Sequence, residues 1–378
     1  MSHRNTRLLA GLGRDDELIE IGPSFNPVAP KAEGWRVTIV DHASQQDLVT
    51  KYAGGAVDTA RIEPVDVVWT GGSLPEAVPE ELHGRFAALI ACHVIEHLPD
   101  FLGFLRSAET LLDPGRGALL LAVPDKRFCF DFFRPPSTTG QFLAAHRAGR
   151  RLHTPAAMFD HVAYSATDAG QAGWSARQLT GLRLEHRLDQ AMAEMEGAEA
   201  AKDYTDCHGW QFTPASFELA VLEFGALGLT DWRVEWLEPQ PAVEFLVRLV
   251  RGRESFANAG AREARRLELL KRLVLELRDQ ADRLLGHEPP PWAEARFGAL
   301  EAALRQAQDS QATRIAAEIE AARQVQDSQA ARIAAEIEAT RAALAPMRGA
   351  LEELRPVGAA MAAMLPVRRA IARLRGRG

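Results

Sequence analysis

Two histidines and a glutamate in "ACHVIEHLPD" (91–100) have types and spacing that could do chemistry. His93, Glu96 and His97 spell H-x-x-E-H, the residue order of inverted zinc metalloproteases. Two histidines one turn apart bind the same metal only when a helix of several turns carries both. Here a β-rich run enters the motif and Pro99 follows it, which leaves about one turn of helix. Catalytic zinc also needs a third protein ligand, and nothing downstream singles one out. The sequence therefore predicts no metal ligands and keeps a zinc hydrolase as the weakest alternative.

The segments around this motif alternate between strand and helix signals. A helix is predicted over 100–112, where apolar residues follow helical spacing before "DPGRG" ends the pattern. The two strands beside it are continuous apolar runs, which is typical of strands buried on both faces of a parallel sheet. All the strands predicted in this part of the chain lie at 17–22, 35–41, 65–72, 86–94 and 117–125. This alternation indicates an open α/β sheet.

Residues 126–212 lose that regularity and are rich in histidine, aromatic residues, proline and glycine. We interpret them as an insertion, partly helical around 175–200, whose ends leave and rejoin the sheet beside the strand ends. Such a position suits a substrate lid. Regular structure returns with a helix at 213–228, which has Thr213 as its N-cap and Pro214 at its first position. The strands predicted at 229–237 and 241–252 then form a β-hairpin.

A second composition begins near residue 255. The segment 255–291 holds a leucine-rich charged helix and a proline-rich linker, and 292–345 is predicted to be one long helix. The long helix contains an 18-residue repeat, 306–323 followed by 324–341, and this period equals five helical turns. Its apolar stripe is too narrow for a lone buried helix, so we expect pairing with another copy as a coiled coil and hence a homo-oligomer. A solvated single helix held by charge pairs is the alternative.

The last segment, 346–378, carries arginines without acidic residues from Arg355 onward. Its end, "PVRRAIARLRGRG", has the pattern of a basic amphipathic helix that could contact anionic lipid, and a solvated tail is the alternative.

Composition narrows the class of protein. The formal net charge of −7 argues against a nucleic-acid partner bound through a general basic surface. Three cysteines in no C-x-x-C pair fit a reducing compartment rather than a disulfide framework. The N-terminus lacks the apolar stretch of a signal peptide, and no uncharged apolar run approaches the ~20 residues of a membrane span. The sequence predicts a cytoplasmic protein.

The predicted strand ends carry residues suited to a nucleotide-like cofactor. Gly22 lets the backbone approach a ligand, and Asp41 follows about 20 residues after that turn, where a carboxylate could accept both ribose hydroxyls. Nicotinamide and adenosyl cofactors share this acid, so Asp41 alone does not separate them. The absence of G-x-G-x-x-G disfavours a dinucleotide.

With these residues at its strand ends, the sequence resembles the class I S-adenosylmethionine-dependent methyltransferases. The segments that carry the resemblance are "ELIEIGPS", "VTIVDHAS", "FAALIACHVIEHLPDFLGFLRSAETLLDPGRGALLLAVPDKR" and the hairpin at 229–252. The longer string "IGPSFNP…GW…VDH…GGSL…HVIEHLPD…AVPDKRFCFDFFRP" is similar to a subgroup associated with bacterial surface-polysaccharide assembly. The resemblance implies a methyltransferase-like domain over 1–254, with a Rossmann-like seven-stranded sheet ending in an antiparallel β-hairpin.

The resemblance also implies S-adenosylmethionine as the cofactor and assigns its contacts. Glu20 and Gly22 would belong to the first cofactor motif, Asp41 would take the ribose, and Cys92 and His93 would flank the methionine moiety. Gly72, Ser73 and Leu74 would lie near the adenine. The sequence departs from the family at one point. Only Gly22 remains of the glycines of the first motif, and three prolines follow, so the first helix is expected to be short or missing.

The implied reaction is an in-line displacement that the enzyme promotes by alignment, with a base if the acceptor is a hydroxyl. The candidate bases are His93, Asp125 and His161, with Asp206 and His208 in "YTDCHGW". Two interpretations of Asp125-Lys126-Arg127 stay open, an anion-binding group and an ordinary charged surface. The predicted function is O-methylation of a saccharide or a glycan-related small molecule. A non-catalytic, methyltransferase-like coiled-coil scaffold in glycan assembly is the alternative, motivated by the shortened glycine motif.

Overall fold

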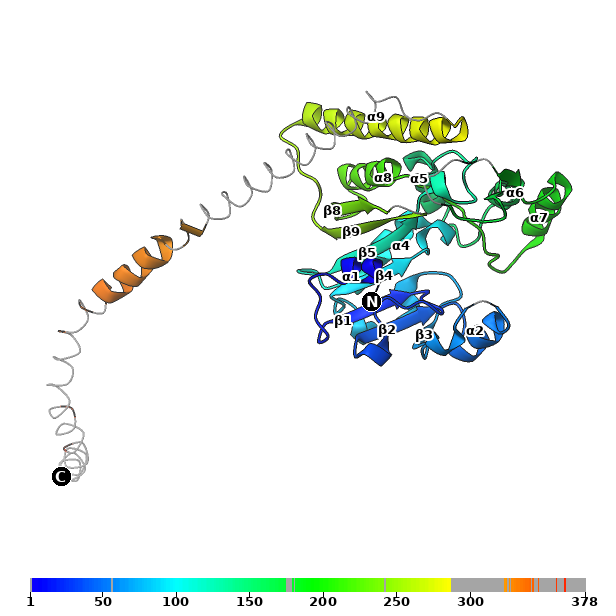
Figure 1. Ribbon diagram of the computed structural model, residues 1–378. Coiled ribbons are helices and arrows are strands. Elements are labelled where there is room, and N and C mark those ends of the chain that lie inside the picture. Colours follow the sequence, from blue (N-terminus) through cyan, green and yellow to red (C-terminus); the bar gives the residue numbers. More distant parts are fainter. Residues whose placement is uncertain are drawn as a thin grey trace, which may run out of the picture. The chain divides into compact units, whose positions relative to one another are not determined.

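The computed structural model describes residues 2–286 apart from 56, 175–178, 180 and 241–242, and residues 323–340 apart from 325 and 327, together with 342, 346, 358 and 364. The chain divides into two compact units, Met1–Pro289 and Pro290–Gly378. The first unit contains one large sheet with helices on both faces (Figure 1). This division is coarser than the boundaries expected from the sequence at 254, 291 and 345.

The sheet has seven strands, and its architecture confirms the predicted fold class. The strand order is β3 (Val67–Val68), β2 (Arg36–Asp41), β1 (Glu17–Ile21), β4 (Ala88–Cys92), β5 (Ala118–Pro124), β9 (Glu244–Arg251) and β8 (Trp232–Pro239). The first five strands pair in parallel, whereas β9 runs antiparallel to both β5 and β8. The chain reverses its direction of travel across the sheet between β1 and β4. The carboxyl ends of these two strands therefore form the topological switch point at which open α/β sheets bind ligands.

Burial explains why the central strands form where they do. All seven residues of β5 are buried, and so are the first four of β4, because helices cover both faces. Side chains alternate between two clusters: Ile19 and Leu89 belong to the core on one face, and Leu18 and Ile90 to the core on the other. The edge strand β3 is only two residues long, much shorter than the predicted 65–72.

One face of the sheet is covered by α4 (Phe101–Leu111), α5 (Thr139–Arg147) and α8 (Pro214–Ala226), whose apolar side chains share one core with the strands. Asp100 caps α4 by accepting a hydrogen bond from the Gly103 amide at 2.8 Å, and Thr213 caps α8. Both helices lie where the sequence predicts them.

The other face is covered by the short α1 (His3–Leu8) and by the chain between β1 and β2. Within this connection the structure forms only one 3₁₀ turn, Lys31–Glu33. The expectation of a short or missing first helix is confirmed. Next along the chain come α2 (Gln45–Tyr52) and α3 (Leu74–Ala77), with 3₁₀ turns at Thr59–Arg61 and Glu80–Leu82.

The insertion is more regular than predicted. Besides α5 it forms α6 (Pro155–Ala163), α7 (Leu188–Ala200) and a small sheet of β6 (Ala166–Asp168) and β7 (Leu182–Leu184). A further 3₁₀ turn, Lys126–Phe128, opens the insertion directly after β5. Two of its helices lie outside the range 175–200 that the sequence suggested.

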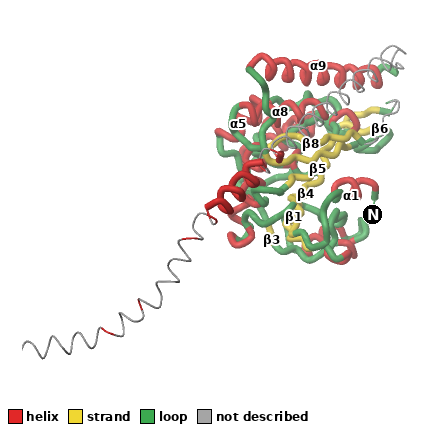
Figure 2. The backbone as a smooth tube through the Cα atoms, turned by 90° about the vertical axis from the view of Figure 1, so that its left-hand side faces the viewer, coloured by secondary structure: helices red, strands yellow, loops and turns green. Residues whose placement is uncertain are grey.

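Helix α9 (Ala259–Leu284) confirms the predicted leucine-rich helix and packs on α8, so it belongs to the same compact unit as the sheet. Figures 1 and 2 both show α8 between the β8–β9 hairpin and α9. In the second unit, residues 328–340 are helical, and Ile333 and Ile337 of the predicted stripe are 58% and 49% exposed. Nearly all of the first repeat and most of the basic tail lie outside the described residues. No helix in the described parts of the chain is long and apolar enough to cross a membrane.

Candidate functional site

The carboxyl ends of β1 and β4 meet at the switch point, and the backbone there takes unusual conformations. Gly22, directly after β1, has φ +62°, a left-handed value that glycine adopts at little cost. Ser24 and His93 adopt φ values of 45° and 54° without being glycine. Such positions cost about 1–3 kcal/mol each and are concentrated at functional sites. We call the strand ends that carry Gly22, Asp41, Gly72 and His93 the cofactor edge.

Asp41 ends β2 and is buried, with its carboxylate turned toward the loop after β1. One oxygen accepts the Ser24 amide at 3.1 Å and lies 3.5 Å from the Ser24 hydroxyl. The other oxygen accepts the His42 amide at 2.8 Å and lies 2.7 Å from His42 Nδ1. Asp41 therefore links the ends of β1 and β2. A ribose hydroxyl could replace the long contact to the Ser24 hydroxyl without breaking the three shorter ones.

Glu20 does not reach the cofactor edge directly. Its two oxygens accept the amides of Val28 at 2.7 Å and Ala29 at 3.1 Å, which fixes the turn that replaces the first helix. Burial raises the pKa of this carboxyl to about 7, although both amide hydrogen bonds act in the opposite direction. The expected direct contact of Glu20 with the cofactor is therefore corrected to a role in shaping this loop.

The turn after β3 carries the residues expected near the adenine. Gly72 has φ +81°, and no atom lies within 4 Å of where a Cβ would be, so the backbone here is open to a ligand. Ser73 occupies the N-cap of α3 without a side-chain capping bond, which leaves its hydroxyl free of that role. Leu74 differs from the expectation, because its side chain is buried in the core beneath the sheet edge. The left-handed Gly22, the open turn at Gly72 and the ordered Asp41 fit an adenosyl cofactor.

Cys92 and His93 follow β4 at the centre of this edge. Burial raises the pKa of the Cys92 thiol to about 12, which makes it a poor nucleophile. His93 is partly exposed, and its Nε2 lies 2.8 Å from Oε2 of Glu244 at the start of β9. Burial acts to raise the pKa of Glu244, but the hydrogen bond from His93 and the charge of Arg4 outweigh it and lower that pKa. An ionised Glu244 therefore accepts a hydrogen bond from Nε2–H of His93, which leaves the lone pair on Nδ1 of the neutral ring.

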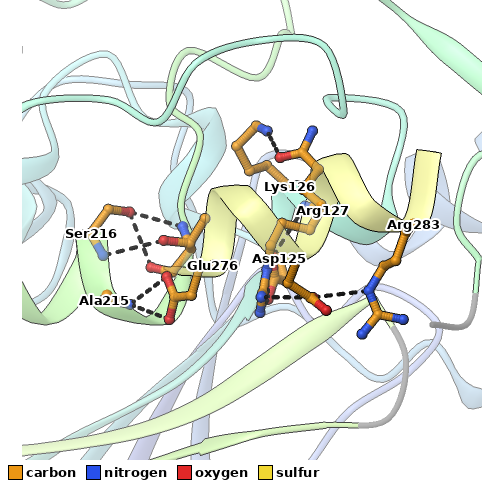
Figure 3. Close-up of polar contacts among 10 residues, drawn as sticks. Asp125, Lys126, Arg127, Ala215, Ser216, Glu276 and Arg283 are labelled. Carbon is orange, nitrogen blue, oxygen red and sulfur yellow. Dashed lines mark hydrogen bonds and ion pairs between the residues drawn. The ribbon is translucent and has the colours of Figure 1, made fainter. Parts of the chain in front are cut away.

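Asp125 is not available as a base. Its carboxylate is buried and accepts hydrogen bonds from Nε and Nη2 of Arg127 at 2.9 and 2.6 Å, and Arg127 also contacts Asp279 of α9 (Figure 3). Nζ of Lys126 donates to Gln280 of α9 at 2.7 Å and to the Phe132 carbonyl at 2.9 Å. The interpretation of Asp125-Lys126-Arg127 as an anion-binding group is wrong, because all three side chains already make hydrogen bonds within the protein. Those of Lys126 and Arg127 bind residues of α9.

The third candidate base, His161 of α6, lies in a second group of histidines. Its Nδ1 accepts the His208 amide at 3.3 Å, and burial lowers its pKa to about 4. The structure also places His208 with Glu96 and His97, so that one ligand-type atom of each lies within 4.8 Å of the others. Each of these three residues stands in a motif noted from the sequence, but the sequence does not show that they meet, because more than a hundred residues separate His97 from His208.

Residues 1–182 match the family described as "Methyltransferase domain". No curated protein matches the chain. Three of the solved structures that resemble it each align with 66% of the chain. One, described as a zinc-dependent alcohol dehydrogenase of Rhodobacter sphaeroides, has 14% identity, TM-score 0.36 and 90% of its own chain covered. A second, described as an S-adenosylmethionine-dependent methyltransferase of Listeria monocytogenes, has 12% identity, TM-score 0.33 and 95% covered.

The third is the 1,6-didemethyltoxoflavin-N1-methyltransferase of Burkholderia thailandensis, solved with bound S-adenosylhomocysteine, at 13% identity, TM-score 0.32 and 77% covered. These structural likenesses are too distant to bear on function. The family match over residues 1–182 and the strand order support a methyltransferase domain, and its predicted extent to residue 254 stays a prediction. The methyl donor of this class of enzyme is S-adenosylmethionine.

Proposed function

We propose that the protein transfers a methyl group from S-adenosylmethionine to a hydroxyl of a saccharide or a glycan-related small molecule. The observation that carries the proposal is the pair of His93 and Glu244 at the end of β4, with Nε2 and Oε2 separated by 2.8 Å. This pair presents a basic imidazole at the switch point of the sheet, where a hydroxyl acceptor would need its proton removed.

The cofactor would lie along the cofactor edge. The backbone of Gly22 and the carboxylate of Asp41 would hold the ribose side, the turn at Gly72 and Ser73 the adenine side, and Cys92 and His93 the methionine side. When bound, the cofactor supplies an electrophilic methyl group on a sulfonium. The enzyme's own contribution is then alignment of the acceptor and acceptance of its proton.

Nδ1 of His93 would accept the proton of the acceptor hydroxyl. The carboxylate of Glu96 lies 3.8 Å from this nitrogen and Glu244 lies on the other side of the ring, so two negative charges stabilise the imidazolium once it forms. Arg4 of α1, with its Nη1 3.5 Å from Glu244, keeps that carboxylate ionised throughout.

The choice of a saccharide rests on the resemblance to a subgroup associated with surface polysaccharides. The insertion 126–212 would form the lid over the acceptor. Tyr204, at the end of this insertion, is exposed, and its hydroxyl donates to the His97 carbonyl at 2.9 Å in the turn after β4. An exposed aromatic ring with a fixed hydroxyl suits recognition of a sugar.

The remaining parts of the proposal concern the C-terminal region. The long helix at 292–345 would pair with other copies of the chain as a coiled coil. The basic tail would rest on the inner face of the cell membrane, with the protein in the cytoplasm. Ile333 and Ile337 support the first point, because they are exposed in a single chain and repeat at helical spacing.

The direct test uses methyl-labelled S-adenosylmethionine with nucleoside-diphosphate hexoses and free hexoses as acceptors, and mass spectrometry to locate the added methyl group. We expect a methyl ether on one hydroxyl and no product from the hexose that lacks this hydroxyl. Methylation confined to the nitrogen of amino sugars or to carboxylates would overturn the hydroxyl assignment.

The alternative is a non-catalytic scaffold, which the nearly saturated Asp41 carboxylate and the single glycine after β1 favour. Calorimetry with S-adenosylmethionine separates the two functions. A scaffold would release no heat of binding at high protein concentration, whereas the enzyme would bind one cofactor per chain.

A further inference from the structure

We propose that Glu96, His97 and His208 bind a divalent transition-metal ion of the zinc type. These residues come from the turn after β4 and from the end of the insertion, and one ligand-type atom of each lies within 4.8 Å of the others. Two imidazoles and one carboxylate are a ligand set used by catalytic zinc, with further positions left for water or substrate. The set differs from the apparent H-x-x-E-H motif, because His93 is bonded to Glu244 instead.

The carboxylate of Glu96 is the strongest sign of a missing partner. The side chain is only 1% exposed, and neither oxygen has a hydrogen-bond partner among the described residues. The nearest basic nitrogens, His93 Nδ1 and His97 Nε2, stay 3.8 and 3.7 Å from Oε1. A buried carboxylate without partners is strongly unfavourable unless a cation compensates it.

Both histidines are oriented as metal ligands usually are. Nδ1 of His97 lies 2.8 Å from Asp206 Oδ1, which leaves Nε2 to face Glu96. Nδ1 of His208 lies 2.6 Å from Asp131 Oδ2, which leaves its Nε2 free in the same way. A carboxylate on one ring nitrogen sets the tautomer and the orientation of the other nitrogen, and ligating histidines almost always have such a partner.

The two chain segments that carry the ligands are held together before any ion binds. The Gly209 amide donates to the Glu96 carbonyl at 2.7 Å, and the Trp210 indole donates to the Leu98 carbonyl at 2.6 Å. A Cβ at residue 209 would lie 2.9 Å from the ring of His153, so any larger residue would force that ring to move. The ligands are therefore preorganised rather than assembled from mobile chain.

The surrounding charges favour a divalent cation. Glu96 is one of the proposed ligands, and two further carboxylates, Asp206 and Asp131, are hydrogen-bonded to the ligand histidines. The cation beside these carboxylates is Arg134, 3.9 Å from Asp131 Oδ1. With neutral imidazoles the sum is three negative charges and one positive, which leaves −2. Imidazole ligands select zinc, iron or related ions over Mg²⁺, which prefers oxygen ligands.

The role of the ion rests on the proposed function. Glu96 Oε1 lies 3.8 Å from Nδ1 of His93, so an ion bound to Glu96 would adjoin the proposed base. A hydroxyl that occupies an open position of the ion would lose its proton more readily, because the ion stabilises the alkoxide. His93 would then accept this proton while the ion holds the oxygen in place. With Glu96 bound to the ion, Glu244 alone would balance the charge of the imidazolium.

The test measures metal binding by itself. The full-length protein, stripped with a chelator, is titrated with Zn²⁺ against a competing fluorescent chelator, and the bound zinc is counted by elemental analysis. We expect one zinc per chain that Mg²⁺ does not displace. We also expect X-ray absorption to show two imidazole nitrogens at about 2.0–2.1 Å. Absence of stoichiometric zinc in the folded wild-type protein would overturn the proposal.

Variants connect the binding to these residues. His208→Ala and Glu96→Gln should weaken zinc binding at least ~100-fold, and Asp206→Asn, at an exposed side chain, about 10–100-fold. His146→Ala is the matched control, because its Nδ1 also lies 2.8 Å from an aspartate, Asp100, but outside the cluster. Equal affinity in all four proteins would refute the assignment, and Asp206→Asn keeps the test valid if a ligand variant does not fold.

Cofactor binding separates this proposal from the proposed function. Calorimetry of the metal-free protein with S-adenosylmethionine reports the methyltransferase site alone. Zinc binding without cofactor binding would support the metal site and count against the enzyme. Cofactor binding without zinc binding would do the reverse.

Discussion

Oε2 of Glu244, at the start of β9, lies 2.8 Å from Nε2 of His93, at the end of β4, although 151 positions separate the two residues in the chain. The antiparallel last strands of the sheet therefore supply the carboxylate that orients a residue of the central parallel strands. His93 also adopts φ 54°, so both its backbone and its ring are held in one conformation.

If this pair is the catalytic base, His93→Ala should lower kcat by about 10²- to 10⁴-fold, the usual contribution of a general base. Glu244→Gln should cost less, because the imidazole remains. The affinity for S-adenosylmethionine, measured by calorimetry, should change little in either variant. His186→Ala, at an exposed histidine, is the control. Wild-type kcat in His93→Ala would remove His93 from the mechanism.

Asp41 should be needed for cofactor binding, and Asp41→Asn separates two reasons for this, with Ser24→Ala as the control for the hydroxyl contact. If the carboxylate binds the ribose, Asp41→Ala loses affinity, whereas Ser24→Ala loses little because only a 3.5 Å contact is removed. If the carboxylate only positions the loop after β1, Asp41→Ala loses affinity because the hydrogen bond from the Ser24 amide is lost. In that case Asp41→Asn, which keeps an acceptor oxygen, should bind nearly as well as wild type. Calorimetry on the three variants decides between the two.

Glu20 predicts that stability depends on pH. The pKa of this buried carboxyl is raised from its ordinary 4.5 to about 7 in the folded protein, so the stabilisation is complete below 4.5 and is lost as the pH rises through about 7. The loss is on the order of 3 kcal/mol in the free energy of unfolding. Urea denaturation between pH 4.5 and 8 measures it. Glu20→Gln should show a shallower dependence, and an unchanged slope would contradict the assignment.

Helix α9 should contribute to the stability of the first unit rather than act as a linker. Leu269 is fully buried against Leu219 and Leu222 of α8. Leu269→Ala should therefore lower the free energy of unfolding by about 2–5 kcal/mol, as expected for a buried leucine. Val274→Ala, on the same helix with the side chain 65% exposed, should have little effect in the same denaturation experiment. Equal effects of the two substitutions would show that α9 does not pack this way in solution.

The proposed coiled coil should depend on its isoleucines. Replacing Ile333 and Ile337 by aspartate should lower the particle mass measured by light scattering, because charges would enter the apolar seam. A substitution of Glu336 by glutamine on the same helix is the control. An unchanged mass in the double variant would favour a solvated single helix.

The sheet could be predicted because its strands are buried on both faces. Runs such as "ALLLAVP" have no polar residue to interrupt them, so local sequence alone reveals the strand. The edge strand β3 gives a weaker signal, and the prediction of 65–72 was too long because only two residues pair with β2. The insertion escaped prediction for another reason. Its helices α6 and α7 pack on one another, whereas α5 packs on α4 and α8, so no single apolar period marks all three.

The site could be predicted only where it depends on strand ends. Gly22, Asp41 and His93 each follow a strand, and the topology brings these ends to one edge. Asp125 was predicted as a candidate base because its environment depends on a distant part of the chain. Arg127 binds the Asp125 carboxylate and also contacts Asp279 of α9, which lies 152 positions after Arg127. The grouping of Glu96 with His208 was missed for the same reason. The local sequence showed one sign of chemistry at Glu96, namely an acidic residue in the turn that follows the apolar strand β4.

The last turns of α9 bind the start of the insertion as well as α8. Gln280 donates to the Phe132 carbonyl at 2.6 Å and accepts from Nζ of Lys126 at 2.7 Å. A chain cut short before α9 would therefore lose these hydrogen bonds together with the burial of Leu269. The insertion would then be anchored less firmly where it leaves β5, and a loss of activity in such a truncation would not by itself report on the segment beyond α9.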